Sequence, residues 1–240
     1  MSDLSRVTAV ILAGGLGTRL QKIVSDQPKV MAEINCKPFI AYLLDRLVEV
    51  DIERIIISTG YMSTQIEKRI GASYKDVSIV YSKEENPLGT GGALKLAGQV
   101  VDMEYCLVMN GDSYTELDPV SLFISHKQKN AIITLLVKEI DNTTRFGIIQ
   151  INEQNEIIKF MEKGSSKGSG LINAGVYIMN TSTIQKIPEK TPYSLEYDFF
   201  PSKIGQGIYG YKTKGRFIDI GTPESYAKAE AFFEQKPVSA

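Results

Sequence analysis

Small and cationic residues near the start of the chain form a pattern suited to binding phosphate. Residues 12–20 read LAGGLGTRL and directly follow an apolar segment. The three glycines allow a tight turn whose backbone N–H groups can approach a phosphate, because no Cβ intervenes. Arg19 adds a planar phosphate donor, and Lys29 adds a compact positive charge. Taken alone, these residues also fit an ordinary glycine-rich turn with a salt-bridged arginine and a surface lysine.

Two familiar phosphate-binding motifs do not fit this segment. The Walker A spacing, GxxxxGK followed by Ser or Thr, is absent. Leu20 stands where a dinucleotide fingerprint needs its third glycine, and no Tyr-x-x-x-Lys set follows, which argues against an NAD-dependent oxidoreductase. A second glycine-rich segment, residues 88–93 (LGTGGA), stands at a predicted helix start. Its backbone can lie flat against a nucleobase, and the N-terminus of the predicted helix favours anionic groups. A flexible loop is the alternative.

Two aspartates follow strand-like segments. Asp112 comes after the apolar run 105–109, and Asp219 comes after residues 216–218. Ligands bind beyond the carboxyl ends of strands in open α/β sheets, and one or two carboxylates there can hold Mg²⁺. For each aspartate alone, a turn or a helix cap is the alternative role.

Further polar residues border apolar segments in the second half. Glu162-Lys163 opens a polar loop, so Lys163 could hold a second phosphate. Asn173 and Glu196 are suited to hydrogen-bonding sugar hydroxyls. A solvated lysine, a strand-end asparagine and a helix N-terminal glutamate are the alternatives.

Strands and helices alternate along the first half of the chain. We expect strands at 7–12, 54–59, 77–81 and 105–109. We expect helices at 39–50, 63–70, 93–101 and 119–129. This alternation predicts a parallel sheet with right-handed crossovers.

The second half is rich in strand-like segments. They lie at 131–138, 148–151, 157–161, 171–179, 208–212 and 216–218, the last two forming a final strand pair. A polar loop covers 163–170, and a terminal helix starts at Pro223 and continues to about residue 234. We therefore expect an α/β fold: a Rossmann-like mixed, mostly parallel sheet flanked by helices, with a small β-rich insertion.

Composition argues against several classes of protein. The chain has 240 residues with 27 Lys and Arg against 28 Asp and Glu, a net charge of −1. This balance argues against nucleic-acid binding through bulk charge and against a polybasic membrane anchor. One histidine, His126, and two distant cysteines, Cys36 and Cys106, cannot form a zinc site without carboxylates. We expect His126 to be an exposed or helix C-terminal cation.

The apolar run at residues 7–13 is too short to span a membrane, and its flanks do not resemble a signal peptide. We therefore expect a soluble, cytoplasmic protein whose cysteines are free thiols, with no membrane or nucleic-acid partner.

Taken in order, these segments resemble the sugar-1-phosphate nucleotidyltransferases over nearly the whole chain. They are LAGGLGTRL, Pro28-Lys29, LGTGGA, NGD at 110–112, Glu162-Lys163, NAGVY at 173–177 and DIGTPE at 219–224. Within that family, GSGLINAGVYI (168–178) followed by SLEYDFFP (194–201) is most similar to the D-glycero-α-D-manno-heptose 1-phosphate guanylyltransferases. One departure is Lys22, which stands where many relatives carry a proline.

The resemblance implies transfer of a nucleotidyl group from an NTP to a sugar 1-phosphate, giving an NDP-sugar and pyrophosphate for polysaccharide biosynthesis. GTP and D-glycero-α-D-manno-heptose 1-phosphate are the favoured substrates. It implies Arg19, Lys29 and Asp112 as catalytic residues, with Mg²⁺ on Asp112 and Asp219. Implied nucleotide-binding residues are Leu12, Ala13, Gly14, Gly15, Gly17, Thr18, Arg19, Lys29, Gly89, Thr90, Gly91 and Gly111. Implied sugar-phosphate-binding residues are Gly147, Glu162, Lys163, Asn173, Gly175 and Glu196.

The same resemblance implies a single domain over residues 1–235. Residues 1–130 or so would bind the nucleotide, and residues 131–235 would bind the sugar and form the terminal helix. We expect residues 236–240 to fray. A homodimer is the base-rate expectation for assembly.

Other readings stay open at this point. The same reaction could use mannose-, glucose- or another sugar 1-phosphate with a different NTP. A catalytically inactive nucleotide-sugar sensor could share the fold, although the set of Arg19, Lys29, Asp112, Lys163 and Asp219 is complete. A glycosyltransferase would carry Asp-x-Asp after the fourth strand, where this chain reads Asp-Ser-Tyr.

Overall fold

The structure is a computed structural model that describes residues 4–235, apart from residues 16, 18, 21, 22, 25, 163 and 165–167. The strands are β1 (Val7–Leu12), β2 (Glu33–Ile34), β3 (Lys37–Pro38), β4 (Arg54–Thr59), β5 (Ser73–Tyr74), β6 (Val77–Lys83), β7 (Tyr105–Asn110), β8 (Ser113–Thr115), β9 (Ile133–Ile140), β10 (Ile148–Ile151), β11 (Ile157–Met161), β12 (Gly170–Asn180), β13 (Ile208–Thr213) and β14 (Phe217–Asp219). The α-helices are α1 (Phe39–Val48), α2 (Ser63–Ile70), α3 (Gly89–Ala97), α4 (Pro119–Gln128), α5 (Thr181–Gln185), α6 (Pro223–Ala227) and α7 (Ala229–Glu234). Short 3₁₀ turns are η1 (Lys29–Met31), η2 (Gly98–Val100) and η4 (Pro201–Lys203), and η3 (Leu195–Phe199) is a π-helix.

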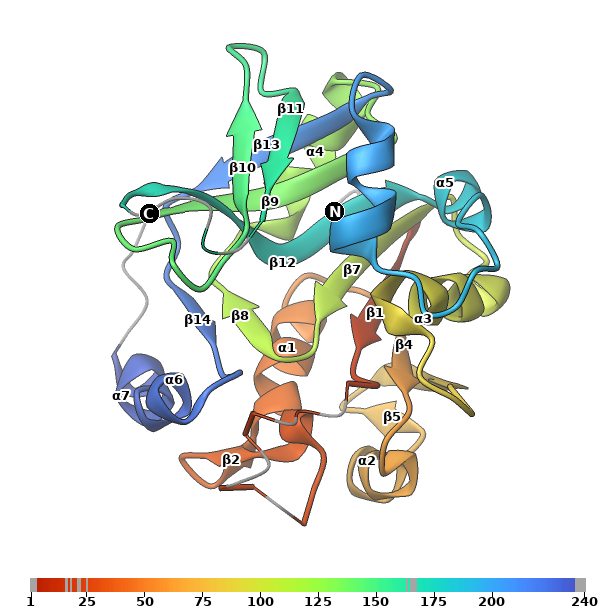
Figure 1. Cartoon of the computed structure of the whole chain (residues 1–240). Helices are drawn as coiled ribbons and strands as arrows, with labels where there is room; N and C mark the ends of the chain where they lie inside the picture. Colours follow the sequence, from red (N-terminus) through yellow and green to blue (C-terminus); the bar gives the residue numbers. More distant parts are fainter. Residues whose placement is uncertain are drawn as a thin grey trace.

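Strands from both halves of the chain share one ten-stranded mixed sheet (Figure 1). The first half supplies the parallel order β7-β1-β4-β6. β12 pairs antiparallel with β7, and β9, β10, β11 and β13 join the sheet through β12. The expected mixed sheet flanked by helices is confirmed, and the β-rich segment is continuous with it.

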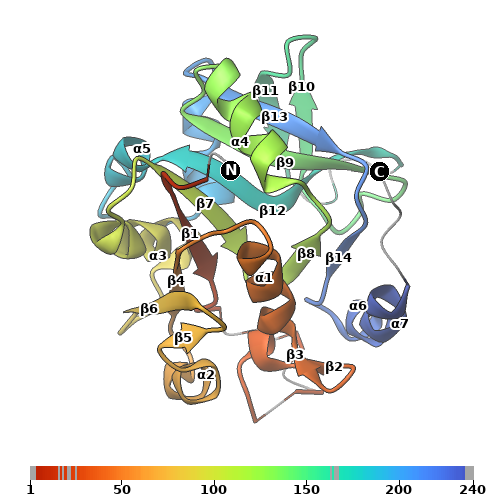
Figure 2. The same cartoon turned by 180° about the vertical axis from the view of Figure 1, so that it is seen from behind.

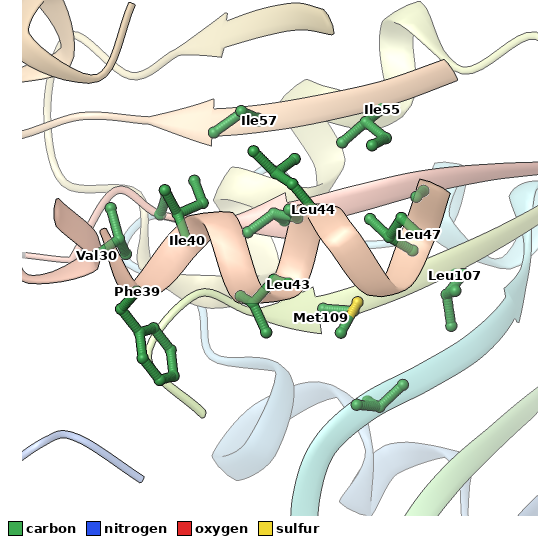
Figure 3. Packing of buried hydrophobic residues seen from close by; sticks show 14 of the residues in the cluster. Val30, Phe39, Ile40, Leu43, Leu44, Leu47, Ile55, Ile57, Leu107 and Met109 are labelled. Atoms are coloured by element: carbon green, nitrogen blue, oxygen red, sulfur yellow. The ribbon is translucent and has the colours of Figure 1, made fainter. Parts of the chain in front are cut away.

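Side chains alternate between the two faces of the central strands and so build two cores. In β1, Ile11 belongs to the core beneath α1, and Val10 belongs to the core on the opposite face. Apolar residues spaced three and four apart give α1 one continuous buried face. Figure 3 shows Leu43, Leu44 and Leu47 of α1 packed against the strands. Figure 2 shows α1 and α4 in front of the sheet, whereas α3 and α5 lie on the side seen in Figure 1. Strands buried on both faces explain the nearly continuous apolar runs in the sequence.

The glycine-rich segment at residues 88–93 differs from its prediction. The helix predicted for residues 93–101 starts at Gly89, so most of this segment forms the first turns of α3. Gly91 packs against Tyr193, whose carbonyl accepts a hydrogen bond from the Gly91 N–H at 2.8 Å. A Cβ at residue 91 would lie 2.8 Å from the Tyr193 ring. Close packing with a distant segment therefore places these glycines in a helix despite their low helix propensity.

The end of the chain also differs from the prediction in detail. The last two strands do not pair with each other, because β13 pairs with β9 and β14 pairs with β8. The terminal helix is interrupted at Lys228, which lets α7 stack Phe233 on Tyr42 of α1 with ring centroids 3.8 Å apart. The tail expected at residues 236–240 lies outside the described residues. Within the described part of the chain, no helix has the length and apolar character needed to cross a bilayer.

Candidate functional site

A cavity of about 870 Å³ opens beyond the carboxyl ends of β1 and β7. Leu12 and Asn110, the last residues of these two strands, line it. The second half of the chain supplies the facing wall through β10, β11, β12 and η3. This is the position where open α/β sheets bind ligands.

Most of the residues singled out in the sequence line this cavity. They are Leu12, Ala13, Gly14, Gly15, Gly17, Arg19, Lys29, Gly89, Thr90, Asp112, Gly147, Glu162, Asn173, Gly175, Glu196 and Asp219. Gly91 and Gly111 are not among the lining residues, and their N–H groups donate to the carbonyls of Tyr193 and Leu12. Thr18 and Lys163 lie outside the described residues.

The loop after β1 is shaped by its glycines. Gly17 has φ +60, in the left-handed region that favours glycine. A Cβ on Gly14 would overlap Glu84 Oε1, so the loop packs directly on that carboxylate. Apart from Gly15 itself and its two chain neighbours, no described atom lies within 4 Å of the Cβ position of Gly15. Arg19 lines the same cavity, so the loop and the cation expected to hold phosphate lie along one wall.

Lys29 and Asp112 form an ion pair in the cavity wall. Lys29 Nζ lies 2.7 Å from Asp112 Oδ2, and the two side chains are 9% and 39% exposed. Ser113 Oγ donates to Asp112 Oδ1 at 3.2 Å. Burial by itself raises the pKa of Asp112, but the charge of Lys29 and the hydrogen bonds from both neighbours hold the pKa below its usual value. Asp112 is therefore an ionised carboxylate that faces the cavity.

Asp219 lies beside this pair because β14 pairs with β8. In that ladder Asp219 is opposite Ser113. A Cβ on Gly221 would lie 2.5 Å from Asp219 Oδ1 and 3.1 Å from Lys29 Nζ, so the ammonium is close to both carboxylates.

This arrangement fits a divalent cation with oxygen ligands. The Lys29 ammonium is paired with Asp112 and lies close to Asp219, so the carboxylates compensate positive charge at this place. Mg²⁺ commonly takes only one or two protein carboxylates and completes its shell with water and substrate phosphates. Within the described residues no cluster of three or more His, Cys, Asp or Glu occurs, so a metal ion at this place would depend on Asp112 and Asp219.

Asn173 spans an irregularity in β12. The pairing register with β9 shifts between Asn173 and Tyr177, and Gly175 within this bulge has φ +74. Asn173 Oδ1 accepts from the Gly175 N–H, and its Nδ2 donates to Tyr177 Oη, both at 2.9 Å. Burial raises the pKa of Tyr177 well above 10, so its hydroxyl stays neutral. The Asn173 amide is thus held in place and keeps one N–H for a ligand.

Glu196 is held at the start of the π-helix η3. Ser194 caps this helix and accepts from the N–H groups of Glu196 and Tyr197. Glu196 Oε2 accepts from Thr90 Oγ1 at 2.7 Å and from Ser194 Oγ at 2.9 Å. Since Thr90 belongs to α3, this carboxylate joins the two sides of the cavity. Such π-turns occur frequently at functional sites.

Several lining residues were missed by sequence reasoning. Glu84 directly follows β6, so the strand-end rule that pointed to Asp112 would also have found it. Its Oε2 accepts from the Leu88 N–H at 2.9 Å, and burial raises its pKa despite that hydrogen bond. Asn110 ends β7, and its buried Oδ1 has no hydrogen-bond partner among the described residues. The remainder are mostly apolar or aromatic: Phe146, Ile148, Ile149, Phe160, Met161, Tyr197, Pro201 and Phe217.

The expectation of an exposed or cationic His126 is wrong. The side chain is 1% exposed, because α4 packs it onto β9. Its Nδ1 lies 2.9 Å from Thr134 Oγ1 and its Nε2 lies 2.8 Å from Asn180 Oδ1. Burial lowers the pKa of His126, so it is a neutral core residue outside the cavity wall.

Comparisons with known proteins identify the family of the chain. Residues 8–236 match the family described as Nucleotidyl transferase. The chain is 40% identical over 223 residues to the D-glycero-alpha-D-manno-heptose 1-phosphate guanylyltransferase of Aneurinibacillus thermoaerophilus, with 92% of this chain and 96% of that protein covered. It is 35% identical to the Campylobacter jejuni protein of the same name, with coverages of 91% and 96%.

Solved structures agree with the fold. The crystal structure of HddC from Yersinia pseudotuberculosis has a TM-score of 0.84 at 36% identity and covers 94% of this chain and 99% of its own. A crystal structure of HddC complexed with GMP-PN gives a TM-score of 0.83 at 35% identity, with the same coverages. The chain therefore belongs to the nucleotidyl transferase family and is a nucleotidyltransferase.

Proposed function

We propose that this protein transfers a guanylyl group from GTP to D-glycero-α-D-manno-heptose 1-phosphate, giving GDP-heptose and pyrophosphate. The observation that carries the proposal is the meeting of the glycine loop, the Lys29–Asp112 pair, Asp219 and the Asn173 bulge in one cavity. The choice of substrates is supported by the names of the Aneurinibacillus and Campylobacter relatives and by the GMP-PN complex of HddC.

The reaction is a displacement at the α-phosphorus of the nucleotide. An oxygen of the sugar phosphate forms the new P–O bond in line, and the bond from the α-phosphorus to the bridging oxygen breaks to release pyrophosphate. Such a transfer depends on positioning and charge neutralisation, so it needs no nucleophilic side chain. Arg19 and the N–H groups of Gly14, Gly15 and Gly17 hold the β- and γ-phosphates, and Lys29 neutralises charge near the α-phosphate.

Asp112 and Asp219 would hold Mg²⁺. When bound, the ion supplies neutralisation of charge on the nucleotide phosphates. The low pKa of Asp112 keeps this carboxylate ionised and able to act as an oxygen ligand. Lys29 lies close to both aspartates and adds a fixed positive charge at the same place.

The second half of the chain holds the sugar in this proposal. Asn173 and Glu196 hydrogen-bond the hydroxyls, and their fixed positions limit which epimers fit. Gly147 and Gly175 let the ring approach the backbone, and Glu162 adds a further polar group to the wall. Lys163, expected to bind the sugar phosphate, lies outside the described residues.

Glu84 supports guanine as the base. Its carboxylate lines the cavity beside Gly89 and Thr90, and the Leu88 N–H fixes Oε2 at 2.9 Å. Guanine carries adjacent N–H donors at N1 and N2, which a carboxylate can accept together. The other common bases do not present two adjacent donors of this kind.

The direct test measures pyrophosphate release with Mg²⁺, crossing GTP, CTP, UTP, dTTP and ATP with heptose, mannose, glucose and N-acetylhexosamine 1-phosphates. Turnover with GTP and the manno-heptose phosphate is the expected result. Turnover only with another pair would replace the substrates and keep the reaction. Tight nucleotide-sugar binding without turnover on any pair would refute the reaction and favour a sensor.

A variant at the predicted metal ligand tests the mechanism. Asp112→Asn removes the carboxylate charge at nearly constant volume, and we expect turnover to be lost while the circular dichroism spectrum is unchanged. Asp102→Asn is a matched control, since Asp102 forms an ion pair with Arg54 at 2.6 Å outside the cavity wall. Near-wild-type rates for Asp112→Asn at saturating Mg²⁺ would contradict the assignment.

A further inference from the structure

Carboxylates outnumber cations along the described wall of the cavity. The carboxylates are Glu84, Asp112, Glu162, Glu196 and Asp219, and the cations are Arg19 and Lys29. Both substrates of the proposed reaction are anions, and Lys29 is already paired with Asp112. A further cation at the edge of the cavity would therefore help to attract and hold the anionic substrates.

Arg145 is such a cation. Its neighbours Phe146 and Gly147 both line the cavity. The Arg145 guanidinium carbon lies 5.7 Å from the centroid of the Phe146 ring, and Nη2 lies 3.8 Å from Asp219 Oδ1. The side chain keeps 43% of its area exposed. Arg145 is therefore at the edge of the cavity, beside a carboxylate expected to bind the metal.

The backbone that carries Arg145 is firmly anchored. Thr143 is 1% exposed, and both its N–H and its hydroxyl donate to the Gly168 carbonyl, at 3.1 and 3.0 Å. The Phe146 N–H donates to the Thr143 carbonyl at 2.9 Å and closes a turn around Arg145. The Phe146 ring packs edge-on against Phe217 with centroids 5.7 Å apart. These contacts thus hold the backbone turn from which the Arg145 side chain extends.

The contact between Arg145 and Asp219 is a weak one. At 3.8 Å it is an ion pair but too long for a hydrogen bond. Exposed ion pairs contribute little to stability, so this pair costs little to break. A guanidinium has five N–H donors and binds phosphate through two parallel hydrogen bonds. A phosphate group can therefore replace Asp219 as the partner of Arg145.

We propose that Arg145 binds the phosphate of the incoming sugar 1-phosphate. In-line displacement places the attacking oxygen and the leaving pyrophosphate on opposite sides of the α-phosphorus. Arg19 and Lys29 come from the first half of the chain and face the nucleotide. Arg145 comes from the β9–β10 connection and precedes Gly147 by two residues, on the side assigned to the sugar. The inference rests on the proposed function, because it names the residue that receives one of its substrates.

The test replaces Arg145 and a matched arginine elsewhere. Arg69 is the control, because it forms a similarly loose and exposed ion pair, 3.5 Å from Glu33 Oε1, outside the cavity wall. Steady-state kinetics of Arg145→Gln, Arg145→Lys and Arg69→Gln would vary each substrate in turn. Calorimetry in EDTA would measure binding of the sugar 1-phosphate without a metal ion.

We expect Arg145→Gln to raise the KM of the sugar 1-phosphate by roughly 10- to 100-fold and to change the KM of GTP less than about 2-fold. Its affinity for the sugar 1-phosphate in EDTA should fall by a similar factor, and Arg145→Lys should recover part of the loss. Arg69→Gln should match the wild type. An unchanged sugar-phosphate KM, or equal changes in both KM values, would overturn the inference. Absence of turnover in the wild type would instead refute the proposed function, and the EDTA titration would still decide the role of Arg145.

Discussion

Replacing Tyr177 by Phe removes the hydroxyl that hydrogen-bonds Asn173, the residue that spans the β12 bulge. The hydrogen bonds of Asn173 to Tyr177 and Gly175 form a clamp on the bulge. Tyr177 is fully buried, and its ring packs edge-on against Phe200 with centroids 4.9 Å apart. The phenylalanine ring can keep that packing. The substitution removes Oη, which accepts the hydrogen bond from Asn173 Nδ2 at 2.9 Å and also interacts with the Asn110 side chain. Asn173 then keeps the Gly175 N–H as its remaining partner within the bulge.

The expected cost follows from the partial burial of this hydrogen bond. Leaving a buried N–H donor without a partner costs about 1–3 kcal/mol of unfolding free energy, and the exposure of Asn173 to the cavity favours the lower part of this range. For a chain of this length each kcal/mol lowers Tm by about 2–4 °C, so the expected decrease is roughly 2–12 °C. Asn173 also loses part of its fixed orientation, and the KM of the sugar 1-phosphate should rise while the KM of GTP is unchanged.

Chemical denaturation of Tyr177→Phe measures the change in unfolding free energy, and steady-state kinetics measures the two KM values. Tyr209→Phe is the control, because its hydroxyl donates to Glu156 at 3.3 Å on the surface, where deletion should cost less than about 0.5 kcal/mol. Adding Asn173→Leu completes a double-mutant cycle, which isolates the energy of the pair. A Tyr177→Phe variant as stable as the wild type, with the same sugar-phosphate KM, would refute the reasoning about the clamp.

Three further predictions concern the conformation, protonation and specificity of single residues. Gly175→Ala should lose at least about 1 kcal/mol more than Gly205→Ala. Both glycines have φ +74, but only the Cβ at residue 175 is crowded, and equal losses in denaturant would contradict this. His126, the chain's single histidine, should titrate in ¹H NMR below 6.5, because burial lowers its pKa. Its contribution to stability is then present above that pH and is lost as the pH falls through the lower, folded-state pKa, and a midpoint of 6.5 or above would refute its burial as a neutral group. Glu84→Gln should lower kcat/KM for GTP by about 10-fold and weaken the preference for GTP over inosine triphosphate, which lacks the 2-amino group. Parallel losses with both nucleotides would exclude a contact between Glu84 and the 2-amino group of guanine.

The parts of the fold with strong local periodicity could be predicted from the sequence. β1, β4 and α2 match their expected ranges, because apolar runs and helix-spaced residues report burial directly. The strand-end rule likewise placed Asp112 and Asp219 in the cavity wall. That both aspartates lie close to the Lys29 amine depends on the pairing of β8 with β14, which joins segments about a hundred residues apart.

Other features depend on contacts that no local pattern reports. His126 sits in the last turn of α4, as expected for a cation, but α4 packs that face against β9 and Asn180. The helical start of α3 at Gly89 depends on Tyr193, a residue far along the chain. Aromatic residues such as Phe146 read as core in the sequence, and only the folded chain shows which of them face the cavity.

The two contacts made by Lys29 and Arg145 suggest how binding of nucleotide and metal are linked. Lys29 pairs with Asp112 and Arg145 pairs with Asp219, so each expected metal ligand has a cationic partner in the structure. In the proposed reaction, substrate phosphates attract the same two cations. Phosphate binding therefore weakens both ion pairs and leaves the carboxylates with uncompensated negative charge, which favours Mg²⁺. Because linkage is reciprocal, Mg²⁺ must strengthen phosphate binding by the same factor. The carboxylate-rich wall therefore binds anionic substrates through its cations and the metal ion, and not through its own net charge.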